Sequence, residues 1–245
     1  MLNSNMTNED YLVSLLSSHD TRVLDFGSGE GNLVRKLHYA KFDAVGCDIL
    51  QWYKACEGKQ VNGLMIGKDL ICNTENHIPF ADEHFTSIVS NQVIEHISDL
   101  DAIARELNRV IKPGGFAYLL FPVKESIIEP HTKIPLLQHF NPSSIIFALL
   151  ISIKIFMRNL IAGKDSRVSV AQKVRESRLY FQDHIHFRHL NDVKMIFEGA
   201  GFEVRDETSK WFMSRYSNSY ILRLISFILK PKYFIGSHLL LRKFN

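Results

Sequence analysis

The chain has 245 residues, of which 46% are hydrophobic and 22% are charged. This composition excludes a disordered chain and a disulfide-stapled miniprotein, and it suffices for a full hydrophobic core. The three cysteines are an odd number without a CxxC pair, which indicates reduced thiols and disfavours a zinc site. Residues 1–140 carry 12 basic and 18 acidic side chains, whereas residues 141–182 carry 7 and 2 and residues 205–245 carry 8 and 2. The acidic and basic parts are therefore expected to contact different partners.

Over the first 121 residues, β-rich runs alternate with helical stretches, which is typical of a parallel sheet covered by helices on both faces. Helices are expected at Gly31–Ala40 and Leu100–Ile111. The second of these is stopped by the Lys-Pro-Gly-Gly sequence after it, because proline cannot continue a helix and glycine suits the turn. Strands are predicted at Thr21–Phe26, Phe42–Asp48, Val61–Ile66, Phe85–Asn91 and Gly115–Phe121.

Residues 122–188 break this alternation with four prolines and two basic apolar stretches, and they are predicted to form a cap over the site. A helix at Asn191–Ala200, a sixth strand at Gly201–Arg205 and a closing strand at 238–244 are expected after the cap. We predict a single domain, 1–245, with three parts: a cofactor-binding core at 21–121, a substrate cap at 122–188 and a C-terminal part at 189–245.

A glycine loop connects the first predicted strand to the helix after it. Its pattern is Asp25-x-Gly27-x-Gly29-x-Gly31, and its glycines allow sharp turns and close approach to a ligand. Such a loop by itself fits a dinucleotide, a plain nucleotide or no ligand. The third glycine comes one residue earlier than in the dinucleotide fingerprint GxGxxG. Asp25 would repel a pyrophosphate but attract the amino group of an amino-acid-like ligand.

Six short motifs, in this order and spacing, resemble those of the class I S-adenosylmethionine-dependent methyltransferases. They are the glycine loop, Gly46-Cys47-Asp48, Gly67 to Leu70, Ile78 to Asp82, Ser90 to His96 and Arg109 to Gly115. The resemblance implies an α/β, Rossmann-like, seven-stranded and mostly parallel sheet with a mainly helical cap insertion. It also implies that the last strand runs antiparallel beside the fifth and sixth, and that S-adenosylmethionine is the cofactor.

By the same resemblance, Asp48 would hold the ribose hydroxyls and Asp69 the adenine amine, while Asp25 would lie near the amino group of the cofactor. The expected cofactor-binding residues are Asp25, Phe26, Gly27, Ser28, Gly29, Gly31, Asp48, Ile49, Asp69, Leu70 and Asn91. A pseudoenzyme that binds the cofactor without turnover is the alternative from another functional class.

Histidines are the candidates for removing a proton from a hydroxyl acceptor, since a neutral histidine has a pKa near physiological pH. His96, with Glu95 beside it, directly follows the fourth strand, although a purely local structural role is equally compatible with that position. His131 belongs to a Glu-Pro-His segment that resembles methyltransferases of bacterial surface-polysaccharide pathways. His186 lies in a histidine-rich run before the last helix.

A metal-dependent subgroup, the small-RNA 2′-O-methyltransferases, has a glutamate where this chain has Gln92. The chelating set of that subgroup is therefore incomplete in this chain, so no catalytic metal is expected. Glu95, His96 and His186 remain from that set, and they leave metal assistance open.

Two segments, 145–161 and 220–230, combine a narrow basic stripe with a wide apolar face. Helices of this kind can lie in a membrane interface beside anionic headgroups, or they can pack on the sheet and expose only the stripe. The aliphatic residues between the basic ones disfavour nucleic acid as a partner. No predicted segment approaches the roughly 20 apolar residues of a membrane-spanning helix. The sequence thus predicts a cytoplasmic protein that these segments could attach to the inner face of a membrane.

The functional hypothesis is O-methylation of a sugar hydroxyl in a cell-surface glycan or its lipid-linked precursor. Methylation of a lipophilic small molecule such as a quinone precursor is the alternative. RNA 2′-O-methylation is disfavoured by Gln92 and by the aliphatic character of the basic segments. The sequence does not specify the oligomeric state.

Overall fold

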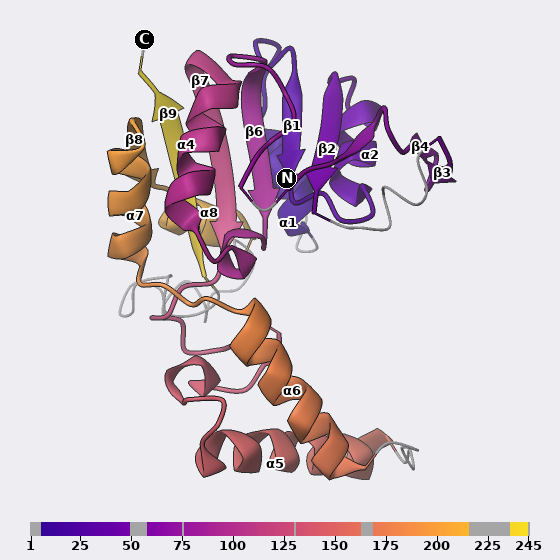
Figure 1. Cartoon of the computed structure of the whole chain (residues 1–245), viewed down its shortest axis with the longest axis vertical. Coiled ribbons are helices and arrows are strands. Elements are labelled where there is room, and N and C mark those ends of the chain that lie inside the picture. Colours follow the sequence, from indigo (N-terminus) through magenta and orange to yellow (C-terminus); the bar gives the residue numbers. More distant parts are fainter. Residues whose placement is uncertain are drawn as a thin grey trace.

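The computed structural model describes residues 6–49, 58–74, 76–129, 131–162, 169–215 and 236–244. Seven strands form one sheet in the order β5-β2-β1-β6-β7-β9-β8 (Figure 1). These strands are β1 (Val23–Phe26), β2 (Ala44–Asp48), β5 (Leu70–Cys72), β6 (Phe85–Asn91), β7 (Ile111–Phe121), β8 (Phe202–Asp206) and β9 (Ser237–Lys243). The helices are α1 (Asn8–Leu15), α2 (Asn32–Tyr39), α4 (Leu100–Val110), α5 (Ile145–Ala162), α6 (Val170–His184), α7 (Leu190–Gly199) and α8 (Thr208–Arg215), with 3₁₀ turns η1 (Ile94–His96) and η2 (Leu137–His139).

Five neighbouring strands run parallel, and β9 runs antiparallel between β7 and β8. The predicted α/β architecture and the antiparallel last strand are therefore confirmed. Parallel strands end at the same edge of a sheet, and ligands of open α/β sheets bind outside that edge. The glycine loop after β1, Asp48 at the end of β2 and η1 after β6 consequently lie at one edge.

The sheet buries both of its faces, because consecutive strand residues point to opposite sides. Leu24 and Ile88 belong to the core packed under α4 and α7, while their neighbours Val23 and Val89 belong to the core under α1 and α2. The predicted helical layers on both faces are present, and the hydrophobic runs of the central strands result from burial on two sides.

The third strand differs from the sequence-based prediction at Val61–Ile66. These residues form a separate two-stranded hairpin, β3 (Gln60–Val61) with β4 (Leu64–Met65), and the strand beside β2 is β5. The cause is the Asn62-Gly63 pair, whose φ angles of 51° and 82° suit a two-residue hairpin turn. The predicted strand crosses this turn, so its two halves pair with each other.

The junction of α4 and β7 also differs in detail from the prediction. Strand pairing begins at Ile111, opposite Phe85, and resumes at Phe116, opposite Ser87. The four residues between them bulge out of the ladder, and Gly114 there adopts a φ of 73°. The Lys-Pro-Gly-Gly sequence therefore interrupts a strand that has already begun.

Residues between β7 and α7 form a mainly helical cap with a small core of its own, in which Phe147 of α5 and Phe181 of α6 have ring centroids 5.3 Å apart. Figure 1 shows α5 and α6 projecting away from the sheet. The amide of Lys124 donates to the carbonyl of Arg188 (2.9 Å), so the cap's two ends meet. Within the described ranges, no helix has the length and apolarity needed to cross a membrane. The predicted segment 220–230 lies outside the described residues.

Candidate active site

Three glycines of the loop after β1 adopt positive φ angles, and their surroundings differ. A Cβ at Gly27 would come within 2.2 Å of the Val93 side chain, and one at Gly31 within 2.4 Å of Leu64. A Cβ at Gly29 would meet no atom of the described residues within 4 Å. Gly27 and Gly31 are thus required by packing against the protein, whereas Gly29 faces open space in which a ligand can approach the backbone.

Two carboxylates accompany this loop. One oxygen of Asp48 accepts a hydrogen bond from the amide of Gly29 (2.8 Å). Asp25 is buried in β1, and its Oδ2 has no hydrogen-bond partner among the described residues. Burial is the main reason why the pKa of Asp25 is raised to about 8, and the negative charges of Glu9 and Asp48 raise it further. A buried carboxyl with a free oxygen is a ready partner for a cationic group.

Other predicted cofactor residues occupy a variety of positions. The side chain of Phe26 is buried in the core, Ser28 is buried with an Oγ that lacks a partner among the described residues, and Ile49 is exposed directly after β2. Asn91 ends β6 and accepts a hydrogen bond from Asn8 of α1 (3.1 Å). Ser28, Ile49 and Asn91 therefore lie around the loop at the carboxyl edge, while the Phe26 side chain faces away into the core.

Asp69 and Leu70 do not lie at that edge. Because β5 starts at Leu70 and its Cys72 is level with Asp48, Asp69 precedes the strand and does not follow it. Its carboxylate accepts from the amide of Met65 (2.7 Å), and Leu70 is fully buried. The expectation that Asp69 and Leu70 follow the third strand was wrong, because that strand is β5 and not Val61–Ile66.

Asn73, which the sequence-based prediction missed, takes the place at the carboxyl end of β5. Its amide donates to the carbonyl of Asp48 (3.0 Å), and its buried Oδ1 has no hydrogen-bond partner in the described part of the chain. The available signal was the Asn-Gly turn at 62–63, which would have moved the third strand to Leu70–Cys72 and placed Asn73 after it.

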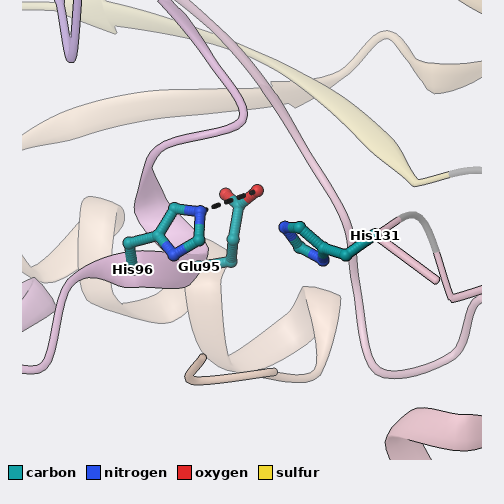
Figure 2. Close-up of side chains that lie close together, drawn as sticks. All are labelled: Glu95, His96 and His131. Carbon is teal, nitrogen blue, oxygen red and sulfur yellow. Dashed lines mark ion pairs between the residues drawn. The ribbon is translucent and has the colours of Figure 1, made fainter. Parts of the chain in front are cut away.

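Glu95, His96 and His131 converge although 35 residues separate the last two in sequence. One ligand atom from each lies within 4.8 Å of the others. Figure 2 shows the two imidazoles on either side of the Glu95 carboxylate, with Nε2 of His96 4.0 Å from Oε1 of Glu95. Glu95 and His96 come from η1, whereas His131 comes from the first loop of the cap. The site is therefore built across the junction of the core and the cap.

A hydrogen bond fixes each imidazole at its Nδ1. The Nδ1 of His131 lies 2.6 Å from Oε1 of Glu129, and the Nδ1 of His96 lies 2.8 Å from the carbonyl of His184. A carbonyl can only accept, so Nδ1 of His96 carries a proton. Burial alone would raise the pKa of Glu129, but its hydrogen bonds from His131 and Thr132 outweigh burial and lower the pKa. The ionised Glu129 likewise requires a proton on Nδ1 of His131. In the neutral rings, both Nε2 atoms are free of protons.

Burial keeps the pKa of Glu95 high, at about 7, and lowers that of His96, which the backbone hydrogen bond to His184 only partly offsets. Neither carboxylate oxygen of Glu95 has a hydrogen-bond partner among the described residues. An acid with a raised pKa thus lies beside a histidine with a lowered pKa, an arrangement that favours proton transfer.

Arg188 and His186 support η1 from the end of the cap. The Arg188 guanidinium donates to four carbonyls, those of Ile94, His186, Ile97 and Ser98. The amide of His186 donates to the carbonyl of Glu95 (2.7 Å). His186 therefore contributes a backbone contact to the site, and its side chain is not part of the converging group. Tyr180 of α6, which carried no sequence signal, has its ring centroid 6.0 Å from that of His131.

The comparison with protein families decides which class of α/β protein this is. The family model described as "Methyltransferase domain" matches residues 8–207, which is most of the chain. The chain belongs to the methyltransferase domain family. This match extends through the glycine loop, η1 and the whole cap, so it covers both halves of the site.

Several curated relatives are similar over part of this chain. The biotin biosynthesis bifunctional protein BioHC of Cellvibrio japonicus is 33% identical over 110 residues, 45% of this chain and 21% of that protein. The ubiquinone/menaquinone biosynthesis C-methyltransferase UbiE of Desulfotalea psychrophila is 29% identical over 116 residues, 46% of each chain. The chain thus matches less than half the length of these relatives. An S-adenosylmethionine dependent methyltransferase structure from Mesorhizobium loti has the same fold, with a TM-score of 0.58, 12% identity, and coverage of 98% of this chain and all of that one.

The family and the fold identify S-adenosylmethionine as the cofactor, and the residues of this methyltransferase fit it. Asp25 offers a buried carboxyl whose Oδ2 has no partner in the described part of the chain, which suits the amino group. The open space at Gly29 admits a ligand against the backbone. Asp48 places a carboxylate at the end of β2, next to that space.

Proposed function

We propose that this methyltransferase O-methylates a hydroxyl of a lipid-linked or lipophilic acceptor at a membrane surface. The observation that carries the proposal is the meeting of Glu95, His96 and His131 between the carboxyl edge of the sheet and the cap. A ring carbon that the ring itself makes nucleophilic can accept a methyl group without a nearby base. A hydroxyl, in contrast, must lose its proton to become a nucleophile.

In this proposal, four groups hold the cofactor. Asp48 binds the ribose hydroxyls, Asp25 faces the amino group, Gly29 lies against the methionine end, and Asn73 borders the adenine. When bound, S-adenosylmethionine supplies an electrophilic methyl group. The protein contributes alignment, since an in-line displacement depends on the orientation of the acceptor oxygen.

The Glu95, His96 and His131 group receives the acceptor hydroxyl. Each histidine is held by a hydrogen bond at Nδ1, so its Nε2 points toward Glu95. This nitrogen can accept the hydroxyl proton, or it can bind a cation that lowers the pKa of the hydroxyl. Glu129 stabilises His131 in that orientation, as the carboxylate does in other carboxylate–histidine pairs. Because Glu129 belongs to the cap and η1 to the core, the acceptor binds between them.

The exposed face of α5 supports a membrane-bound acceptor. Arg158 is exposed on this helix, and α5 contains no acidic residue. Large apolar side chains are exposed along it at Ile145, Ile146, Leu149, Ile153, Phe156, Met157 and Leu160. A contiguous apolar stripe of this kind marks an interaction site, and the basic cap around it suits anionic headgroups.

Two acceptor classes agree with these features. A lipid-linked sugar is supported by the Glu129 and His131 pair, whose sequence segment resembles polysaccharide-pathway methyltransferases. A quinone precursor is supported by the relatives named for ubiquinone biosynthesis. Both present a hydroxyl and a lipid tail, so the product's chemistry must distinguish them.

The acceptor is tested with the purified protein, S-adenosylmethionine carrying a labelled methyl group, and lipid extracts that contain either lipid-linked glycans or quinone precursors. Mass spectrometry of the labelled product is expected to show an O-methyl ether in one extract, and none with the variant His131→Asn. A methyl group on ring carbon, or equal labelling by His131→Asn, would contradict O-methylation by this group.

Membrane binding is tested by sedimentation with vesicles containing anionic lipid. The triple variant Leu149→Ser, Phe156→Ser and Leu160→Ser is expected to remain in the supernatant at a salt concentration at which the wild type sediments. The matched control is Tyr39→Ser with Met195→Ser, two exposed apolar residues of the core, which should sediment like the wild type. A wild type that stays in the supernatant at low salt would instead indicate that α5 packs against another protein chain.

A further inference from the structure

We propose that Glu95, His96 and His131 bind a divalent transition-metal ion. The sequence led us to expect no metal, because Gln92 stands where a chelating glutamate would be needed. His131 changes this conclusion, since it comes from the cap and supplies a third ligand that the sequence did not place beside η1.

The distances allow one ion to contact all three side chains. Their ligand atoms lie within 4.8 Å of one another, with 4.0 Å between Nε2 of His96 and Oε1 of Glu95. In a tetrahedral site with bonds of about 2.0–2.2 Å, ligand atoms lie about 3.3–3.5 Å apart. The separations therefore exceed those of a tetrahedral site by at most about 1.5 Å, a gap that rotation of the side chains can close.

The hydrogen bonds behind the ligands match those of metal sites. A ligating histidine usually donates its other ring N–H to a carboxylate or a backbone carbonyl. His131 donates to the Glu129 carboxylate (2.6 Å) and His96 to the His184 carbonyl (2.8 Å). Both rings therefore turn Nε2, the nitrogen that carries no proton in the neutral tautomer, toward the same carboxylate (Figure 2). One histidine held in this way is common in proteins. Two such histidines that both face one carboxylate form a set of three metal ligands.

Glu95 is the second, independent observation. Its carboxylate is almost completely buried, and both oxygens lack hydrogen-bond partners within the described part of the chain. A buried carboxylate without hydrogen-bond partners is costly, because no hydrogen bond replaces the solvation that it loses. A bound cation would supply the missing partner at the point where both histidine nitrogens are directed.

The ligand types define the class of metal. Two imidazole nitrogens and one carboxylate oxygen suit Zn²⁺ or another divalent first-row ion, and disfavour Mg²⁺ and Ca²⁺, which prefer oxygen. Three protein ligands leave a position open for an exogenous oxygen. We assign this position to the acceptor hydroxyl, an assignment that rests on the proposed function. The bound hydroxyl gives its proton to solvent, and its oxygen then forms the new bond to the methyl carbon as the carbon–sulfur bond breaks and its electron pair stays on sulfur.

The test measures metal binding directly, by calorimetry with Zn²⁺ and by the absorption spectrum of Co²⁺, on full-length protein first dialysed against a chelator. One ion per chain is expected. Glu95→Gln, His96→Gln and His131→Gln should each abolish this site, and Glu129→Gln should weaken it about 10–100-fold. His139→Gln is the matched control, since His139 is exposed and lies in the cap outside this group.

The absence of stoichiometric binding in the wild type, or equal binding by Glu95→Gln and the wild type, would overturn the site. Unchanged circular dichroism and cofactor binding in each variant show that any loss is local. The assigned role is tested separately: chelation should stop methyl transfer and Zn²⁺ or Co²⁺ should restore it. Methyl transfer that persists after chelation overturns the role but leaves the proposed function standing. A chain that binds the metal but methylates no acceptor contradicts the proposed function alone.

Discussion

The carboxylate of Asp48 accepts a hydrogen bond from the amide of Gly29 at 2.8 Å, and this contact ties the end of β2 to the glycine loop after β1. Together with the amides of Gly27 and Ser28, which both donate to the carbonyl of Cys47, this contact fixes the two strand ends at the edge where the cofactor is proposed to bind. Asp48 thus shapes the loop in addition to its proposed contact with the ribose.

Replacement of Asp48 by alanine should weaken cofactor binding more than tenfold. The variant loses the ribose contacts, and each hydrogen bond to a charged group contributes about 1.5–3 kcal/mol. Calorimetry with S-adenosylhomocysteine measures the effect. Asp43→Ala, which removes an exposed carboxylate that pairs with Arg22 at 3.8 Å, should bind like the wild type. Unchanged affinity in Asp48→Ala would refute the assignment of this residue.

Gly29 and Gly31 should respond differently to the same substitution. Gly31→Ala places a Cβ 2.4 Å from Leu64 at a φ of 77°, so it should lower the free energy of unfolding by more than the roughly 1–2 kcal/mol of the left-handed conformation alone. Gly29→Ala places its Cβ more than 4 Å from every atom that the structure describes and should chiefly reduce cofactor affinity. Urea unfolding and calorimetry on both variants separate the two effects, and a reversed ranking in either measurement would contradict this explanation.

The buried carboxyl of Asp25 should make stability fall as pH rises. Its pKa is about 8 in the folded protein, compared with 3.8 ordinarily, so between these values the folded chain retains a proton that the unfolded chain releases. The free energy of unfolding then decreases with pH, with a limiting slope of about 1.4 kcal/mol per pH unit. Asp25→Asn should remove this slope and be more stable than the wild type at about pH 8. The measurement is urea unfolding at several pH values. If the free energy of unfolding changed with pH equally in the wild type and in Asp25→Asn, this role of Asp25 would be disproved.

Arg188 should act as a positioning residue for η1. Its guanidinium bridges four carbonyls around Glu95 and His96, a geometry that neither lysine nor glutamine can reproduce. Arg188→Gln should lower the melting temperature and also weaken binding of Co²⁺ to the dialysed protein, a readout that a purely structural role elsewhere would not change. Arg175→Gln, at an exposed position of α6, should alter neither property.

The sheet could be predicted because its strands carry local signals. Buried runs bounded by turns identified β1, β2 and β6, and the glycine loop gave the order of the chain around the site. The third strand failed because Val61 to Ile66 has strand-like composition, while the Asn62-Gly63 turn inside it determines the pairing. The wrong placement of Asp69 followed from that one error.

The site was predictable as separate residues and not as a group. His96 and His131 were identified from their positions relative to strands, but their meeting depends on how the cap folds back against η1. Glu129 is recognisable only once its carboxylate is seen to bind Nδ1 of His131. Tyr180 and Arg188 approach from the far end of the cap, and no local pattern specifies that approach.

The hydrogen bond between Lys124 and Arg188 joins the two ends of the cap, and this geometry affects how the cap can change during evolution. The chain leaves the core and returns to it at neighbouring backbone positions, and the segment between them carries its own hydrophobic cluster. Insertions with adjacent ends are tolerated by a host domain because they leave its packing intact. Replacement of this segment would therefore change the part of the chain that is proposed to contact the acceptor and leave unchanged the part that is proposed to hold the methyl donor.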